Sequence, residues 1–329
     1  MNIPDVARPR ARRVLLVALV AAVAVAARCG RSASDPPATG AAAPAAPASA
    51  AGFPKTLVDG AGHTIRLATK PRRIVSQTLG ADEILFAIVP PDRLVGLSAL
   101  ARDRKYSNVV TEATRHPAPS VESAEDMLRL KPDLIFVATY SRAETVQLLE
   151  ATGAPVYRLA NFDTIDGVMN SIHAVGDAIG EPEAAGRLVA SMRSRLAAVV
   201  ARRAGHPRPR VLSYSGGFTA GRDTSFDDML RYAGGINEAA ARGLAKFPKL
   251  STEQVLAWDP DVLVSGVLPG ERDAVRARLT TSAGLAQTTA ARKGQIILID
   301  EPRYLAVSQY MVDAVEQIAD SLDAFERAR

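Results

Sequence analysis

Cysteine is almost missing from this sequence, because Cys29 is the only one in 329 residues. A single thiol excludes a disulfide framework and any zinc or iron–sulfur site made of cysteines alone. The four histidines are dispersed, without the H-x-x-x-H spacing of many zinc enzymes, and the chain has neither a Walker loop nor a G-x-G-x-x-G after a strand. The stretch SYSGG at 213–217 lacks the first glycine of a serine-hydrolase elbow. We therefore predict that the protein is not an enzyme and has no metal site or cofactor of its own.

An excess of positive charge is also missing from most of the chain. The formal net charge is +5, but residues 1–52 hold six arginines against two aspartates, so the remainder is close to neutral. A nucleic-acid partner is therefore not expected. Hydrophobic residues make up 47% of the chain, which is enough to bury a core. The length suggests about two domains of ~150 residues.

The first 52 residues are predicted to contain an export signal followed by a flexible spacer. Residues 1–28 are predicted to be an export signal, because arginines at 8–13 precede an apolar run at 14–27 that is too short to cross a ~30 Å bilayer core. Cys29 follows this run and is the candidate for lipidation; the alternative is an unmodified cysteine. Residues 29–52 are rich in alanine and proline and are predicted to be a flexible spacer.

Two segments of the chain repeat each other. Residues 123–137 read SAEDMLRLKPDLIFV and residues 251–265 read STEQVLAWDPDVLVS, at a constant offset of 128 residues. In each copy a serine can cap a helix, an acidic residue falls in the first turn, and a proline ends the helix before a buried strand. A weaker echo links Pro71–Ser76 with Pro209–Ser213. The repeat predicts two similar α/β lobes.

The predicted fold class is α/β, with two Rossmann-like lobes joined by a long single α-helix and a ligand cleft between the lobes. Alternating strand and helix patterns place the N-terminal lobe at 53–165 and the C-terminal lobe at 209–329. The helical linker is predicted at 166–208, where residues 183–203 form one helix of ~20 residues and roughly 30 Å. Such a connection permits smaller lobe movements than paired hinge strands do.

Several motifs together resemble a known family. They are P-x-R-I-V-S at 71–76, E-x-x-L-x-L-x-P-D-L-I at 125–135, F-T-A-G-R at 218–222 and S-x-E-Q-V-L at 251–256. Residues 53–329 resemble the periplasmic substrate-binding proteins of the cobalamin, iron–siderophore and haem ABC importers. The resemblance implies that Glu125 and Glu253 dock into arginine pockets of an ABC permease dimer, which works with its ATPase. The alternative is that both glutamates only stabilise helix N-termini.

The ligand is expected in the cleft, outside the carboxyl ends of the strands. Aromatic rings in these loops suit a bulky chelate, and arginines suit its anionic groups. The resemblance further implies that Tyr214, Phe247 and Tyr304 lie near ligand-contacting positions. The full set of candidate ligand-binding residues is Gln77, Thr78, Tyr106, Tyr140, Tyr214, Phe218, Arg222, Phe247, Arg303 and Tyr304.

The identity of the ligand stays open between branches of that family. Residues 118–122 read APSVE and lack the tyrosine that many haem carriers have there, and the one tryptophan contrasts with the several of cobalamin carriers. An iron–siderophore complex is therefore favoured, with cobalamin or haem as alternatives and an exported sensor or scavenger without a permease as another class. We expect a periplasmic monomer that meets the membrane only through a lipid on Cys29.

Overall fold

The computed structural model describes residues 52–328. The predicted export signal, most of the spacer and Cys29 lie outside the described residues. Within residues 52–328, no helix is both long enough and apolar enough to span a bilayer.

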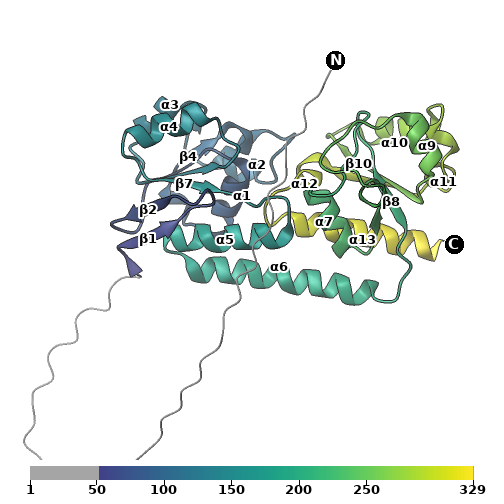
Figure 1. Cartoon of the computed structure of the whole chain (residues 1–329). Helices are drawn as coiled ribbons and strands as arrows, with labels where there is room; N and C mark the ends of the chain where they lie inside the picture. The colour runs from purple at the N-terminus through teal and green to yellow at the C-terminus, as the bar shows by residue number, and fades with distance from the viewer. Residues whose placement is uncertain (1–51, 329) are drawn as a thin grey trace, which may run out of the picture. The chain divides into compact units, whose positions relative to one another are not determined.

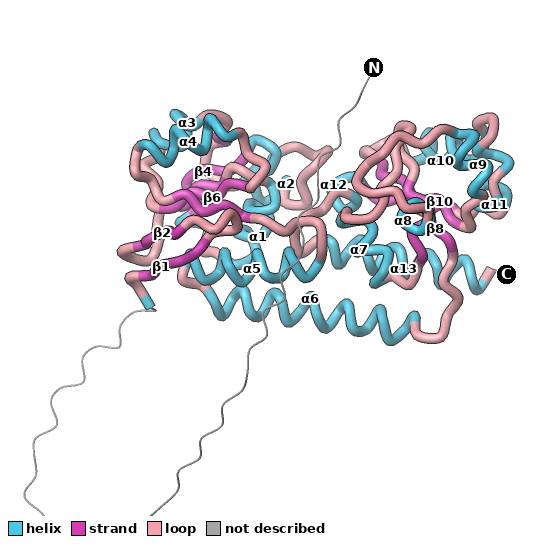
Figure 2. The backbone as a smooth tube through the Cα atoms, in the orientation of Figure 1, coloured by secondary structure: helices cyan, strands magenta, loops and turns pink. Residues whose placement is uncertain are grey.

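The N-terminal lobe is built on a five-stranded parallel sheet (Figures 1 and 2). Its strands lie in the order β5-β4-β3-β6-β7. They are β3 (Ile74–Ser76), β4 (Leu94–Ser98), β5 (Ser120–Val121), β6 (Leu134–Ala138) and β7 (Val156–Leu159). All five residues of β6 are buried, as expected for a central strand covered on both faces. An antiparallel hairpin of β1 (Lys55–Val58) and β2 (Thr64–Leu67) precedes this sheet.

Helices cover both faces of that sheet. They are α1 (Leu79–Ile88), α2 (Val110–Arg115), α3 (Ala124–Arg129), α4 (Ala143–Ala151) and α5 (Ile165–Ile179). Leu134 and Phe136 of β6 share one hydrophobic cluster with α1 and α5, while Ile135 and Val137 share another with α3 and α4. The alternation along one strand therefore separates the two helical layers.

The C-terminal lobe repeats this plan with four parallel strands in the order β11-β10-β8-β9. The strands are β8 (Arg210–Ser213), β9 (Ile236–Asn237), β10 (Val262–Val267) and β11 (Ile296–Asp300). Its helices are α7 (Ser225–Tyr232), α8 (Glu238–Ala241), α9 (Thr252–Trp258), α10 (Arg272–Thr281), α11 (Thr289–Arg292), α12 (Glu301–Tyr304) and α13 (Met311–Arg327).

A single helix, α6 (Pro182–Arg203), connects the lobes, as predicted (Figure 1). It has 22 residues, which corresponds to about 33 Å at 1.5 Å per residue. Gly180 adopts a left-handed φ of 72° and ends α5, and Pro182 opens α6. The buried side chains of α6 recur at alternating steps of four and three residues, at 185, 189, 192, 196, 199 and 203. Its first half packs on α5 and its second half on α13.

One hydrophobic core runs through both lobes. Ile74 and Leu85 of the N-terminal lobe, Val189 of α6, and Val264 and Met311 of the C-terminal lobe all belong to one cluster of buried side chains. Because this cluster continues along α5, α6 and α13, the three helices form a common base beneath the two sheets. The lobes are thus packed together as well as covalently linked.

The sequence repeat corresponds to a repeat in three dimensions. Ser123 and Ser251 cap α3 and α9 through complete capping boxes, whose second members are Asp126 and Gln254. After each helix, one residue takes a left-handed conformation: Lys131 with φ 47° and Asp259 with φ 44°. The prediction of two similar α/β lobes is confirmed.

Candidate functional site

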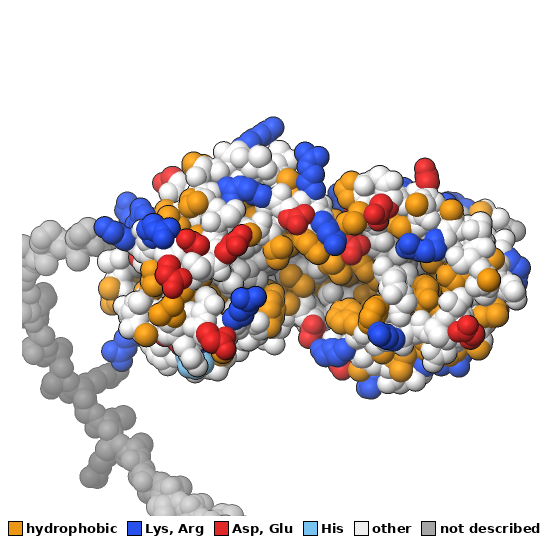
Figure 3. Space-filling model, turned by 90° about the horizontal axis from the view of Figure 1, so that it is seen from above, with side chains coloured by type: hydrophobic (Ala, Val, Ile, Leu, Met, Phe, Trp, Pro, Cys, Tyr) orange, Lys and Arg blue, Asp and Glu red, His pale blue; other side chains and the backbone are white. Residues whose placement is uncertain are grey.

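The loops at the carboxyl ends of the strands border a hollow between the two lobes. Viewed from above, the surface is depressed there, with hydrophobic side chains at depth and charged side chains around the rim (Figure 3). Most of the predicted ligand-binding residues lie in these loops.

Three predicted residues meet in the N-terminal lobe. Thr78 occupies the N-cap position of α1 without a side-chain capping hydrogen bond, and its hydroxyl lies 3.4 Å from that of Tyr140. Tyr140 follows β6, is 69% exposed, and has its ring 6.0 Å from the ring of Phe162. Gln77 follows β3 and accepts a 2.8 Å hydrogen bond from Ser141. The ends of two adjacent strands thus bring these side chains to one wall.

Tyr106 lies in the loop 99–108, which follows β4. The Lys105 ammonium is 5.1 Å from the centre of the Tyr106 ring. The backbone forms a turn at 103–107, since Asp103 accepts hydrogen bonds from the backbone N–H groups of Lys105, Tyr106 and Ser107. Tyr106 itself is half-buried.

The predicted residues of the C-terminal lobe include two exposed aromatic rings. Phe218 is 45% exposed and Phe247 is 59% exposed. Phe218 pairs in antiparallel fashion with Lys249, so Phe247 lies diagonally across on the same face. The Lys249 ammonium is 6.0 Å from the centre of the Phe218 ring. These side chains form a second wall, with aromatic surface and a cation.

Two other predicted residues lie beside this wall. Tyr214 follows β8 and packs, half-buried, against the second hydrophobic cluster of the lobe. Arg222 is exposed, and its guanidinium lies 3.5 Å from the carbonyl oxygen of Gly243.

The structure does not place Arg303 and Tyr304 with the other aromatic and basic candidates. Tyr304 is 9% exposed, and its hydroxyl is hydrogen-bonded to Ser213. Burial raises the pKa of Tyr304 to about 12. Arg303 is exposed but lies 3.8 Å from Asp313 of α13, in a hollow shared with Arg195 of α6. Tyr304 is therefore part of the hydrophobic core, and Arg303 lies beside α13.

The structure shows buried acidic residues that the sequence reading did not single out. Asp82 and Glu83 are consecutive in α1 and are 0% and 1% exposed. Asp82 accepts hydrogen bonds from the hydroxyl and backbone N–H of Ser98, at the end of β4. Glu83 accepts hydrogen bonds from Asn108 and Ser308. The sequence predicts a helix at 82–88, and the inward face of this helix is the one signal that could have indicated them.

Glu301, in α12, is the acidic residue nearest this region in the other lobe. Burial raises the pKa of Glu301, and the positive charge of Lys105 acts in the opposite direction. The interaction connects a loop of the N-terminal lobe with a helix of the C-terminal lobe. Charges of opposite sign on the two lobes therefore attract each other here.

Glu125 and Glu253 occupy equivalent exposed positions in the first turns of α3 and α9. A hydrogen bond from the side chain of Ser251 lowers the pKa of Glu253. Both helices lie on the side of the molecule away from α6 (Figure 1). One lobe therefore presents one carboxylate, and the other lobe presents its counterpart.

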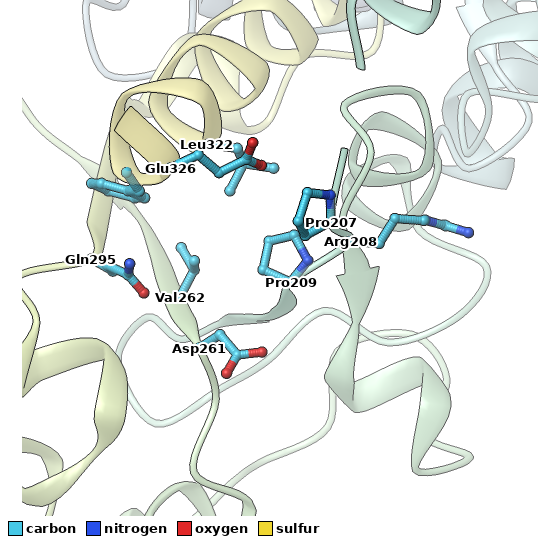
Figure 4. A pocket seen from close by; sticks show the side chains of 9 residues that line it. Pro207, Arg208, Pro209, Asp261, Val262, Gln295, Leu322 and Glu326 are labelled. Atoms are coloured by element: carbon cyan, nitrogen blue, oxygen red, sulfur yellow. The ribbon is translucent and has the colours of Figure 1, made fainter. Parts of the chain in front are cut away.

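A separate hollow of about 220 Å³ lies at the amino ends of the strands of the C-terminal sheet (Figure 4). Pro209, Asp261 and Gln295 line it immediately before β8, β10 and β11, and Glu326 reaches it from α13. This edge holds the amino ends of the strands, away from the predicted ligand loops.

One group of side chains in residues 52–328 has the spacing of metal ligands: His206, Asp323 and Glu326. The Arg203 guanidinium lies 2.6 Å from Asp323 and 2.7 Å from Glu326. Both carboxylates are therefore neutralised by a buried cation, which opposes binding of a metal ion. The group is better described as an ion-pair network between the end of α6 and α13.

Comparison with known proteins agrees with this fold. A curated relative, the cobalamin-binding protein of Halobacterium salinarum, is 30% identical over 283 residues, or 84% of this chain and 75% of the relative. The apo structure of a periplasmic heme-binding protein from Roseiflexus is 31% identical, with a TM-score of 0.63 over 76% of this chain and 98% of that one. The structure of an Fe3+-hydroxamate transport protein from Saccharomonospora viridis, 24% identical, has a TM-score of 0.65 over 82% of this chain and 99% of that chain, and supports the fold alone.

The family match covers most of the globular chain. Residues 74–302 match the periplasmic binding proteins, and this range includes both sheets from β3 to β11. Members of this family bind and carry ligands, so the predicted role as a substrate-binding protein agrees with the match. The chain belongs to the periplasmic binding protein family.

Proposed function

We propose that this protein captures a bulky metal chelate in the hollow between its lobes and delivers it to an ABC permease. The observation that supports this most strongly is the pair of walls formed by the strand-end loops. Tyr140 on one wall and Phe218 and Phe247 on the other are exposed to water, although large aromatic rings are usually buried. A ligand with extended apolar surface would cover them on binding.

The histidines argue for a chelate that brings its own metal ligands. His63 lies in the hairpin loop, His173 in α5 and His206 after α6. His116 lies between α2 and β5, before the amino end of the strand. Its ring packs edge-on against Phe86, and its Nε2 is 2.8 Å from the Pro91 carbonyl oxygen. None of the four therefore belongs to the loops that border the hollow. An iron–siderophore complex or a corrinoid needs no histidine from the protein.

The experiment that tests the function is equilibrium binding to the purified protein. We would titrate it separately with ferrioxamine B, cyanocobalamin and haemin, and follow tyrosine fluorescence and the absorption band of each chelate. We expect saturable binding of ferrioxamine B at one site per chain. Saturable binding of cyanocobalamin alone would instead assign the corrinoid, which the 30% identical relative makes the second candidate. Failure of all three to bind would contradict the proposed cargo class.

We infer that Glu125 and Glu253 dock the loaded protein onto the permease. Their support is their equivalence in the repeat and their exposure on two similar helices. A permease dimer has twofold symmetry, and two equivalent carboxylates match it. We further propose a periplasmic monomer, tethered through a lipid on Cys29. Mass measurement of the membrane-extracted protein would detect that lipid.

A further inference from the structure

The loop 99–108 is held at both ends by two consecutive carboxylates. At its start, Ser98 donates its hydroxyl and its backbone N–H to Asp82. At its end, Asn108 donates its backbone N–H to Glu83 over 2.9 Å and its side-chain amide over 3.0 Å. The loop between them, with Lys105 and Tyr106, therefore depends on α1 for its position.

Glu83 also reaches the other lobe. Its second carboxylate oxygen accepts a hydrogen bond from the hydroxyl of Ser308, which lies between α12 and α13. Its backbone carbonyl accepts a 2.8 Å hydrogen bond from the side chain of Gln309. One residue of the N-terminal lobe is thus bonded to two consecutive residues that belong to the C-terminal lobe.

Asn108 completes the connection. Its side-chain amide donates to Glu83 and also, over 2.9 Å, to the carbonyl oxygen of Pro302 in α12. Glu83, Asn108 and Ser308 therefore form one hydrogen-bonded group at the junction of the lobes. We call this group the junction triad.

A purely structural role does not account for a carboxylate at this place. Burying an ionised carboxylate is unfavourable by several kcal/mol unless its oxygens are fully hydrogen-bonded. The neighbouring residues Ile84 and Leu85 are 0% exposed and join helix and sheet by apolar packing alone. An apolar residue in place of Glu83 would pack equally well, but it would bind neither the Asn108 backbone nor Ser308. What the carboxylate adds is a fixed orientation of the loop relative to the other lobe.

We propose that Glu83 is a positioning residue for cargo capture: through the junction triad it holds the Tyr106 loop and the C-terminal lobe in one arrangement. This inference rests on the proposed ligand site in the hollow. Since the loop is internally rigid, with three backbone N–H groups bonded to Asp103, it moves as a unit when its end is released. Release would therefore displace Lys105 and Tyr106 together relative to the C-terminal lobe.

The test compares Glu83→Ala, Glu83→Gln and Ser308→Ala with the wild-type protein. Glutamine keeps an oxygen for Asn108, and its amide nitrogen can donate to Ser308, so E83Q should keep the hydrogen bonds but lose the charge, and lie between the wild type and E83A. The matched control is Thr288→Ala, because Thr288 is also a fully buried hydroxyl but bonds only within the C-terminal lobe, to Leu285 and Ala291. Two measurements are made: hydrogen exchange of peptides covering 99–109, and dissociation of ferrioxamine B or cyanocobalamin, whichever the wild type binds.

In E83A and S308A we expect faster exchange in 99–109 and about tenfold faster dissociation, the effect of losing a hydrogen bond to a charged group. T288A should match the wild type in both measurements, and E83Q should lie between the wild type and E83A. Wild-type exchange and dissociation in S308A would overturn the inference, even if E83A failed to fold. Equal effects in T288A and S308A would also overturn it. If the wild type bound haemin alone, dissociation of haemin would be measured instead. If it bound none of ferrioxamine B, cyanocobalamin and haemin, the proposed function would fail, and the exchange measurement alone would decide whether the triad couples the lobes.

Discussion

Asp133 and Asp261 hold the same position in the two halves of the molecule. Asp133 accepts hydrogen bonds from the backbone N–H groups of Arg72 and Arg73, at 2.7 and 2.9 Å, and Asp261 accepts one from the N–H of Arg210 at 2.8 Å. Asp133 directly precedes β6, which pairs with β3, and Asp261 directly precedes β10, which pairs with β8. The two copies of the Pro-Asp motif therefore join neighbouring parallel strands at the start of each sheet.

Removing either carboxylate should destabilise the protein. Asp133→Ala and Asp261→Ala leave backbone N–H groups without their charged acceptor, so we expect each to lower the free energy of unfolding by about 1–3 kcal/mol. Urea denaturation measures this. Asp133→Asn keeps one carbonyl oxygen as an acceptor and should lower the free energy of unfolding less than Asp133→Ala does. A wild-type urea midpoint for D133A would show that these hydrogen bonds do not stabilise the protein.

Charge reversal at the two docking candidates should separate binding from transport. In the Glu125→Arg/Glu253→Arg double variant we expect unchanged chelate affinity and no uptake in cells, because a permease surface that receives two carboxylates, as proposed above, would meet positive charge instead. The matched control is Glu144→Arg/Asp273→Arg, which reverses exposed acidic residues in the first turns of α4 and α10. Uptake equal to that of the control would contradict the docking assignment.

Asp82 should make the stability of the protein depend on pH. Burial raises the pKa of Asp82 from 3.8 to about 8. Between these values the folded state holds a proton that the unfolded state has released, so the free energy of unfolding falls as pH rises, by up to roughly 1.4 kcal/mol per pH unit. The decrease ends near pH 8. Urea denaturation of wild type and Asp82→Asn at pH 5 and pH 8 should show D82N gaining relative to wild type at the higher pH.

Asp259 provides the control for that measurement. It is half-buried, but hydrogen bonds from the backbone N–H and the hydroxyl of Thr289 outweigh desolvation and lower its pKa below 3.8. Its stabilisation is lost only as pH falls through that low pKa, so the difference between wild type and Asp259→Asn should be constant from pH 5 to pH 8. A pH-independent difference for D82N as well would show that Asp82 is ionised in the folded protein.

Two glycines test the packing of α6 on α5. A Cβ at Gly176 of α5 would overlap the Cβ of Ala185 in α6, whereas a Cβ at Gly186 meets nothing within 4 Å. Gly176→Ala should therefore destabilise the protein by about 1–3 kcal/mol through overpacking. Gly186→Ala, the matched control, should stabilise it by up to about 1 kcal/mol through helix propensity. Thermal unfolding of both would reveal the opposite signs; equal signs would contradict the close approach.

Arg203 tests the ion pairs that join α6 to α13. Its side chain is 2% exposed and lies 2.6 Å from Asp323, which is 9% exposed. Arg203→Met leaves that carboxylate buried beside fewer cations and should lower the free energy of unfolding by about 3 kcal/mol. Arg203→Met/Asp323→Leu should be more stable than R203M alone. Additive losses in a double-mutant cycle would show that the pair is not coupled.

The regular elements follow from the sequence wherever local signals are strong. The 22-residue α6 could be predicted because its apolar spacing, Pro182 and Gly205 are all local. The capping serines of the repeat predicted α3 and α9 for the same reason. The short elements β1, β5, β9, α8, α11 and α12 were missed, because two to four residues carry too little periodicity, and the six-residue α2 was missed as well.

The candidate site was predicted less completely, for a physical reason. Strand ends could locate Tyr140 and Phe218, because the topology alone brings such loops together. Phe247 lies between α8 and α9 and was supported by the family resemblance. The burial of Tyr304 depends on Ser213, 91 residues away, and that of Glu83 on Ser308, 225 residues away. A helix pattern at 82–88 predicts that one face of the helix is buried. It does not predict that the hydroxyl of Ser308 lies beside the Glu83 carboxylate.

The ties made by Asp133 and Asp261 have a consequence for any partner that touches both lobes. Arg73 and Arg210 also bond to the last carbonyl oxygens of α3 and α9. Glu125 and Glu253 therefore cannot shift independently of the sheets that end at the hollow. A rotation of one half against the other, about any axis other than the line joining the two carboxylates, would alter their separation. A receptor that held both of them would therefore respond to the relative orientation of the halves.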